Sequence, residues 1–220
     1  MIVRLTHVSF NKWWLRIAFW VALIYLTLFE HGYYDFLSLN LLLAYIPVEI
    51  GFWLTPKRHA LLFYPLLVVW LLFLPNAPYL LTDLVHLTLL DAYSPVTNLL
   101  INSPKVWYKF TELIITVGLG TVGGLLSIQA VVKSLSQRWH RDWLRYWLVP
   151  GVSLLSAVGI YIGRFLRIHT VYLLMPNWIV PRILTMWSSR MLFFTGLLFL
   201  VQMAAYGLMV LMQRPRSLDA

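Results

Sequence analysis

The stretch FLPNAPYLLTDLVHL, residues 73–87, interrupts a long apolar segment with two prolines and an asparagine and then carries an aspartate and a histidine. A helix running unbroken through residues 60–90 would be about 46 Å long at about 1.5 Å per residue, and the hydrocarbon core of a bilayer is only about 30 Å thick. Each proline also removes a backbone donor and clashes with the preceding turn. We therefore expect a break near Pro75–Pro78, with Asn76 capping the helix that follows.

The composition of the whole chain is that of a membrane protein. Of its 220 residues, 60% are hydrophobic and 11% are charged, and the mean hydropathy is +0.76, whereas a soluble domain carries about 25% charged residues. The apolar runs are continuous rather than alternating, which favours helices over the strands of a barrel. We expect an all-α polytopic transmembrane helical bundle that forms a single integral membrane domain over residues 1–220. Its six predicted spans cover about residues 13–30, 38–54, 60–81, 111–132, 147–166 and 191–212.

The distribution of basic residues predicts how the chain is oriented. The net charge is +9, but the Lys and Arg residues lie in short loops between spans, which indicates contact with anionic lipid headgroups rather than with nucleic acid. Eleven of the 17 lie on the side of the N-terminus and the other six on the opposite side. We therefore expect both termini in the cytoplasm and the lipid bilayer as partner; a homo-oligomer is left open. The chain has no cysteine, which excludes disulfides and thiolate metal sites.

A polar stripe follows the predicted break. Asn76, Tyr79, Asp83 and His86 are spaced by three, four and three residues, so they share one face of a helix. Two interpretations are open. The stripe either lies in the wet interface of the membrane or lines a cavity that opens to the outer side.

Two arginines at the end of the fifth predicted span are candidate partners of the stripe. The segment GIYIGRFLR places Arg164 and Arg167 three residues apart, at the same predicted membrane boundary as Asp83. An arginine that faces lipid is costly, whereas one that faces the bundle and pairs with a carboxylate is tolerated. We expect Arg164 to pair with Asp83 and Arg167 to be the freer cation. Such a pair alternatively serves only to join two helices.

Two further features concern packing within the membrane. The spacings Gly120-xxx-Gly124 and Gly159-xxx-Gly163 predict close approach of helices. Glu49 is a second intramembrane acid, and without a partner it would take up a proton. We expect it to pair with a basic residue near the inner face; a proton relay is the alternative.

Three segments of the chain resemble a known family. LPNAPYLLTDLVHL at 74–87 and GIYIGRFLR at 159–167 are similar to the two signature segments of a bacterial membrane family, the domain of unknown function 1361, and SPKVWYKF at 103–110 resembles its intervening loop. The resemblance extends over about residues 35–210. It implies a multi-span protein of the bacterial inner (cytoplasmic) membrane, and it implies no particular activity.

This chain departs from the family pattern at two places. The family loop reads Trp-Tyr-Asp where this chain reads Trp107-Tyr108-Lys109, and the family carries Trp-Asn-Ser-Trp-Asp where this chain reads IHTVY, with His169 and Tyr172. Two acids of the family pattern are therefore missing. No mechanism that needs them as metal ligands or general acids operates here.

Three classes of function are compatible with these residues. The first is binding or transport of an anionic small molecule or lipid headgroup at an outward-facing polar cavity, because guanidinium groups bind oxyanions in a fork. The candidate ligand-binding residues are Asn76, Tyr79, Asp83, His86, Trp107, Tyr108, Arg164 and Arg167, with Trp107 and Tyr108 as walls.

The second class is an intramembrane enzyme acting on a lipid-linked substrate. In it Asp83 and His86 would form an acid–base pair or two metal ligands. A third ligand would come from Asp91, Glu112 or His169. The third class is a structural subunit of a membrane complex. The sequence identifies no substrate and no cofactor.

Overall fold

The computed structural model describes residues 12–94, 96–97, 99–168 and 176–213, and in this part of the chain the regular elements are helices. Six helical segments are long and apolar enough to cross a membrane, which confirms the predicted polytopic helical bundle. The α-helices are α1 (Lys12–Phe29), α2 (Phe36–Trp53), α3 (Ala60–Phe73), α4 (Asn76–Asp83), α5 (Pro104–Trp139), α6 (Arg145–Phe165), α7 (Pro176–Thr185) and α8 (Ser189–Met212). The 3-10 helices are η1 (Leu84–Leu90) and η2 (Asp142–Leu144).

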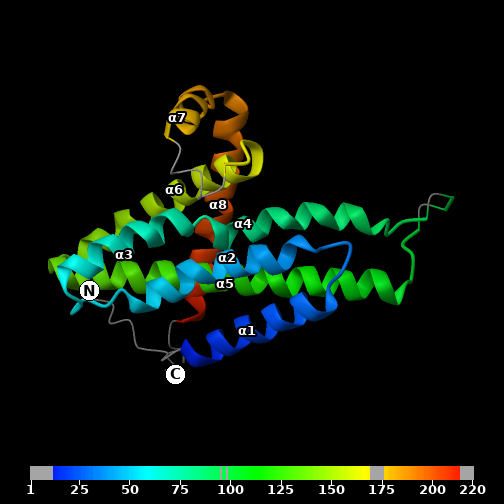
Figure 1. The fold of residues 1–220 in the computed structure, drawn as a ribbon, viewed down its shortest axis with the longest axis horizontal. Coiled ribbons are helices and arrows are strands. Elements are labelled where there is room, and N and C mark those ends of the chain that lie inside the picture. The colour runs from blue at the N-terminus through cyan, green and yellow to red at the C-terminus, as the bar shows by residue number, and fades with distance from the viewer. Residues whose placement is uncertain (1–11, 95, 98, 169–175, 214–220) are drawn as a thin grey trace, which may run out of the picture.

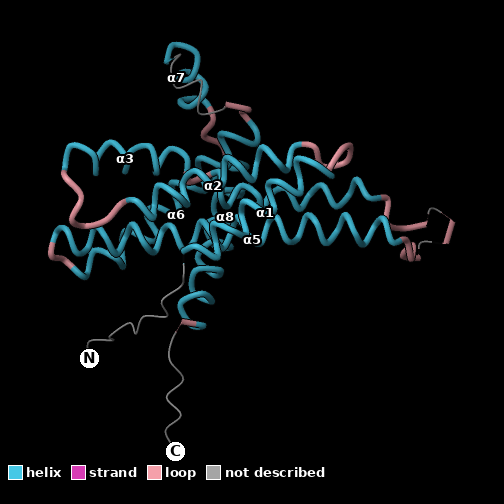
Figure 2. Tube along the Cα trace, turned by 60° about the horizontal axis from the view of Figure 1, so that its bottom comes forward, coloured by secondary structure: helices cyan, strands magenta, loops and turns pink. Residues whose placement is uncertain are grey.

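The helices do not all run in one direction. In Figures 1 and 2, α1 to α6 run back and forth along the long axis of the molecule, whereas α8 crosses them steeply. α8 packs mainly against α6, and of its apolar side chains Met191 alone is buried. The short helix α7, which the sequence did not predict, lies outside the bundle (Figure 1). The last predicted span is therefore a helix of the expected length with an unexpected direction.

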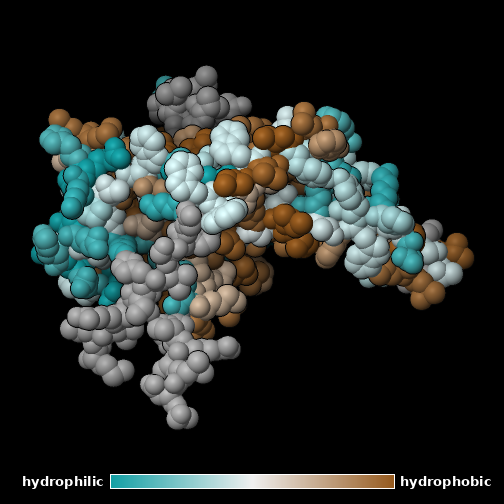
Figure 3. All heavy atoms as spheres, turned by 90° about the horizontal axis from the view of Figure 1, so that it is seen from below, coloured by the Kyte–Doolittle hydropathy of each residue, from teal (hydrophilic) through white to brown (hydrophobic). Residues whose placement is uncertain are grey.

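The two ends of the bundle differ in charge. At one end, the loop between α2 and α3 lies beside the turn between α5 and α6, and hydrophilic side chains gather there (teal, left of Figure 3). We call this the basic end, and it carries Lys57, Arg58, Arg138, Arg141 and Arg145. Toward the opposite end, where α1, α4 and η1 end and α5 begins (Figure 1), lie the described acids Glu30, Asp83, Asp91 and Glu112.

The predicted break in the third span is present, but it is not a sharp bend. Leu74 and Pro75 separate α3 from α4, and both keep right-handed helical dihedrals, so the two helices follow one another as a single rod in Figure 1. The hydrogen bonding changes instead. Ala77 donates its N–H to the Leu74 carbonyl at 3.1 Å, a tighter turn than in an α-helix.

The predicted capping role of Asn76 is wrong. Because Pro75 is itself helical, Asn76 is already the first residue of α4 and cannot adopt the extended backbone of a cap. Its side-chain amide donates instead to the Phe73 carbonyl at 2.9 Å. In a regular α-helix the Phe73 carbonyl would accept from the backbone N–H of Ala77, which here bonds to Leu74. The Asn76 side chain replaces that donor. Pro78 lies in the first turn of α4, as expected.

Both predicted glycine pairs pack against α4. On α5, a Cβ at Gly124 would lie 2.8 Å from the Ala77 Cβ, and one at Gly120 would meet the tip of Leu80. On α6, a Cβ at Gly159 would lie 2.5 Å from Cγ of Pro75, and one at Gly163 would touch the ring of Tyr79. α4 is therefore held closely between two glycine faces, which confirms the packing prediction.

We expect Gly159→Ala to destabilise the protein by about 1–3 kcal/mol, because the rigid Pro75 ring cannot move away from the added methyl group. The measurement is the free energy of unfolding in mixed micelles. Gly151→Ala on the same helix is the control, since a Cβ there meets nothing within 4 Å, and it should be neutral or stabilising by up to about 1 kcal/mol. Equal effects of the two substitutions would contradict close packing at Pro75.

Candidate functional site

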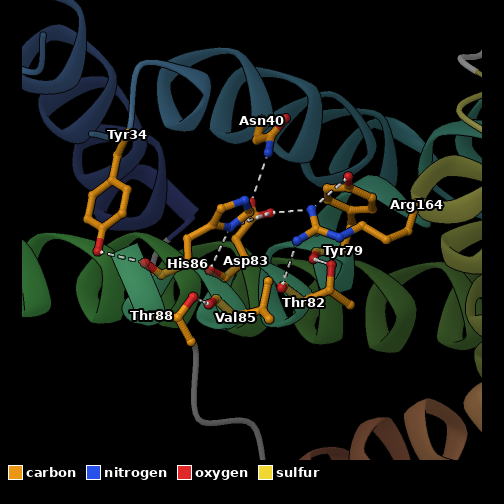
Figure 4. A network of polar contacts seen from close by, with 9 residues as sticks. All are labelled: Tyr34, Asn40, Tyr79, Thr82, Asp83, Val85, His86, Thr88 and Arg164. Carbon is orange, nitrogen blue, oxygen red and sulfur yellow. Dashed lines mark hydrogen bonds and ion pairs between the residues drawn. The ribbon is translucent and has the colours of Figure 1, made fainter. Parts of the chain in front are cut away.

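Asp83 is the centre of a buried polar network that joins three helices (Figure 4). Its side chain is 0% exposed. Oδ1 accepts a hydrogen bond from Nη1 of Arg164 at 3.0 Å, and Oδ2 accepts one from Nδ2 of Asn40 at 2.8 Å. The predicted pairing of Arg164 with Asp83 is confirmed. Asn40, on α2, was not predicted as a member of the site.

Arg164 is held in place by α4 over more than its ion pair. Nη1 also donates to the Tyr79 hydroxyl at 3.0 Å, and Nη2 donates to the Thr82 carbonyl at 3.1 Å. The guanidinium carbon lies 5.3 Å from the centre of the Tyr79 ring, within reach of a cation–π interaction. The side chain is 20% exposed. One end of α6 is thus fixed to α4, with part of the guanidinium near the surface.

His86 lies beside Asp83 and presents one nitrogen to it. Nδ1 lies 3.0 Å from the backbone carbonyl oxygen of Asp83 and 3.9 Å from its Oδ1. A carbonyl only accepts hydrogen bonds, so Nδ1 carries a proton and donates it to this carbonyl. The centre of the His86 ring lies 4.4 Å from that of the Phe36 ring. The His86 carbonyl accepts a hydrogen bond from the Tyr34 hydroxyl at 3.5 Å.

Arg167 differs from Arg164 in its backbone conformation, its exposure and its contacts. It follows the end of α6 in a left-handed conformation, with φ of 52°, and its side chain is exposed. Within the described part of the chain it forms no ion pair or hydrogen bond. Non-glycine residues seldom adopt positive φ, and here that conformation turns the chain away from α6. Arg167 is the freer cation, as predicted.

The other predicted site residues do not converge on Asp83. Asn76 bonds to Phe73, and Trp107 and Tyr108 have exposed rings whose recorded contacts are with Phe110 and Lys109 on their own helix. The Asp83 side chain is 0% exposed, so it does not line an open cavity. His169 and Tyr172 lie outside the described residues.

A second buried cluster lies at the same end of the bundle, and the sequence did not predict it. Lys109 forms ion pairs with Oε2 of Glu112 at 2.9 Å and with Oε2 of Glu30. All three side chains are at most 10% exposed. The i, i+3 spacing of Lys109 and Glu112 was the available signal, but nothing local pointed to Glu30.

Glu49 has the basic partner that was expected. Arg16 on α1 binds it in a fork, with Nε 2.8 Å from Oε2 and Nη2 2.5 Å from Oε1. Tyr45 and Trp53 also donate to this carboxylate. Both members of the pair are partly exposed, which is the ordinary situation of an interfacial ion pair.

The described residues offer no ready metal site. No group of three His, Asp or Glu side chains in them lies close enough to hold a metal ion. Asp91 and Glu112, which the sequence suggested as third ligands, are therefore not gathered around Asp83 and His86. What the arrangement can do is hold one buried carboxylate charged, fix one arginine and leave a second arginine free.

We expect Arg164→Met to destabilise the protein by about 3–5 kcal/mol, because it leaves the buried Asp83 carboxylate without its cation. Asp83→Asn in that background should recover most of the loss, since it removes the unpaired charge. The measurement is a double-mutant cycle on the free energy of unfolding. Arg16→Met, at the partly exposed pair with Glu49, should cost no more than about 1 kcal/mol. Additive effects of the Asp83 and Arg164 substitutions would contradict the coupling.

Comparison with known proteins bears on the family and not on the chemistry. No curated protein and no solved structure matches the chain. A family model described as "Protein of unknown function (DUF1361)" matches residues 39–205. The matched range includes Asp83 and Arg164, and it covers well over half of the chain. The chain is thus an integral membrane protein that belongs to the DUF1361 family.

Proposed function

We propose that this protein binds an anionic small molecule or a lipid headgroup at the end of α6, with Arg167 as the residue that contacts the anion. The observation that carries the proposal is the contrast between the two arginines. Arg164 is occupied by Asp83, Tyr79 and Thr82, whereas Arg167 is exposed and without a partner among the described residues. A guanidinium donates two parallel hydrogen bonds to a phosphate or carboxylate.

In this proposal the buried network positions the binding residue. The ion pair of Arg164 with Asp83 fixes the last turn of α6 against α4. Arg167 follows just beyond this turn with a left-handed backbone and an exposed side chain. The partly exposed guanidinium of Arg164 adds positive charge nearby. Transport would require a path through the protein, for which a homo-oligomer is one solution.

We also propose that this end of the bundle faces outward from the bacterial inner (cytoplasmic) membrane. The support is the charge of the opposite end, where Lys57, Arg58, Arg138, Arg141 and Arg145 gather. Basic loops are retained on the cytoplasmic side. With the basic end inside, Arg167 meets the outer leaflet, and both termini are cytoplasmic.

A structural role is the second candidate, and one observation favours it. The Asp83 carboxylate accepts from Asn40 and Arg164 on neighbouring helices, so the network joins helices without any ligand. In that case Arg167 would be an ordinary surface residue. For the alternative of an intramembrane enzyme, the pair of Asp83 and His86 is the only candidate the sequence supplied, and no observation favours it over the other two.

We expect native mass spectrometry of the gently solubilised protein to show a retained anionic phospholipid or small anion. Arg167→Ala should reduce its occupancy by about 10-fold or more, because a charge-assisted hydrogen bond contributes about 1.5–3 kcal/mol. Arg167→Lys should recover only part of the binding, since an ammonium does not bind in a fork. Arg141→Ala, an exposed arginine at the basic end, is the matched control and should bind as the wild type does.

The same samples separate the competing functions. Occupancy that is unchanged in Arg167→Ala but lost in Arg164→Ala would move the site from Arg167 to the buried pair. An empty protein in every variant would favour the structural role. Elemental analysis completes the test, because a stoichiometric metal would favour the enzyme.

A further inference from the structure

The cluster of Glu30, Lys109 and Glu112 contains one more acid than it has bases. Lys109 pairs with both glutamates, and no other described side chain forms an ion pair with either of them. The side chains of Glu30 and Glu112 are 1% and 3% exposed, and that of Lys109 is 10% exposed. With both acids ionised, the cluster would hold one uncompensated negative charge away from water, which is strongly unfavourable.

The two glutamates differ in how well their oxygens are satisfied. Lys109 contacts Oε2 of both acids, as an ion pair without hydrogen-bond geometry at Glu30, so the difference lies at Oε1. Oε1 of Glu30 accepts the backbone N–H of Tyr34 at 2.9 Å. Glu112 has Lys109 at Oε2, but its Oε1 is buried and accepts no hydrogen bond from any described residue. Hydrogen bonds to a carboxylate favour its charged form. Glu30 is therefore the better site for the negative charge and Glu112 the better site for a proton.

Among the described residues, Lys109 alone forms an ion pair with either carboxylate. The loop between α1 and α2 contributes His31, Tyr34 and Asp35. Tyr34 is fully buried, and Oδ1 of Asp35 accepts a hydrogen bond from the backbone N–H of Gly32. α5 brings Lys105, which lies over the ring of Tyr33, and Tyr108 beside Lys109. From η1 comes His86, whose ring faces Phe36 and Asp83 and whose carbonyl meets the Tyr34 hydroxyl. Burial raises the pKa of Tyr34, so this residue stays a neutral hydroxyl.

We propose that Glu30, Lys109 and Glu112 form a buried proton-binding site, in which Oε1 of Glu112 carries one proton taken from water. With that proton the three side chains sum to zero charge. The site is separate from the anion site proposed above and does not depend on it. The site lies beside the loop between α1 and α2, because Glu30 directly follows α1 and accepts from Tyr34 of that loop. A monovalent cation such as Na⁺ is the other way to balance the charge.

The test is infrared spectroscopy of the purified full-length protein in micelles at neutral pH. We expect the carbonyl band of a protonated carboxylic acid, sensitive to exchange into D₂O. Glu112→Gln should remove this band and still fold, because a carboxamide has the shape of the protonated acid. Asp142→Asn, at an exposed acid of the basic end, is the matched control and should leave the band unchanged. A titration should show one proton fewer bound by Glu112→Gln than by the control.

Three results would overturn the proposal. A band that persists in Glu112→Gln but disappears in Glu30→Gln would put the proton on the other acid. An absent band together with a thermal midpoint that rises with Na⁺, compared with choline at equal ionic strength, would make the cluster a cation site. An absent band without a sodium effect would mean that the cluster keeps its negative charge.

Discussion

The buried carboxylate of Asp83 is the contact through which α2, α4 and α6 are joined. A carboxylate removed from water is stable only when cations and hydrogen-bond donors surround it, and here the donors come from α2 and α6. Arg164 reaches the carboxylate because α6 lies close to α4, and α6 lies close because Gly159 leaves room for the Pro75 ring. Packing and charge balance therefore depend on the same few contacts. The missing side chain at Gly159 therefore brings α6 close enough to α4 for Arg164 to reach Asp83.

The features that the sequence predicted correctly are those with a large free-energy cost at a known position, such as a charged side chain in lipid or a proline within a helix. Arg164 and Asp83 were expected to meet because both are too expensive to face lipid, and prolines at fixed positions marked the interruption after α3. The partner Asn40 was missed because a neutral amide can hydrogen-bond to many kinds of polar group, so its residue type does not identify its partner. Glu30 was missed because an acid at a helix end is normally solvated. The steep direction of α8 was not predictable from its apolar composition, which fixes length and burial but not crossing angle.

The two polar networks at this end of the bundle share a boundary residue. Tyr34 donates its hydroxyl toward the carbonyl of His86, next to Asp83, and its backbone N–H to Glu30. It is fully buried in spite of lying in a loop. A loop residue enclosed in this way cannot shift without disturbing hydrogen bonds on both sides. Glu30 and Tyr34 thus tie the loop between α1 and α2 to the polar interior, while residues 31–33 between them are exposed.

The separation of Asp83 and Arg164 along the chain has a consequence for biosynthesis. The two are 81 residues apart, and chains are made from the N-terminus, so the acid enters the membrane long before its cation exists. Asn40, on the preceding hairpin, is already present and offers the carboxylate a first donor. Until α6 has been made, Asp83 therefore has a hydrogen-bond donor but no cation. A nascent chain that stops before α6 carries the buried acid with its amide donor but without its cation.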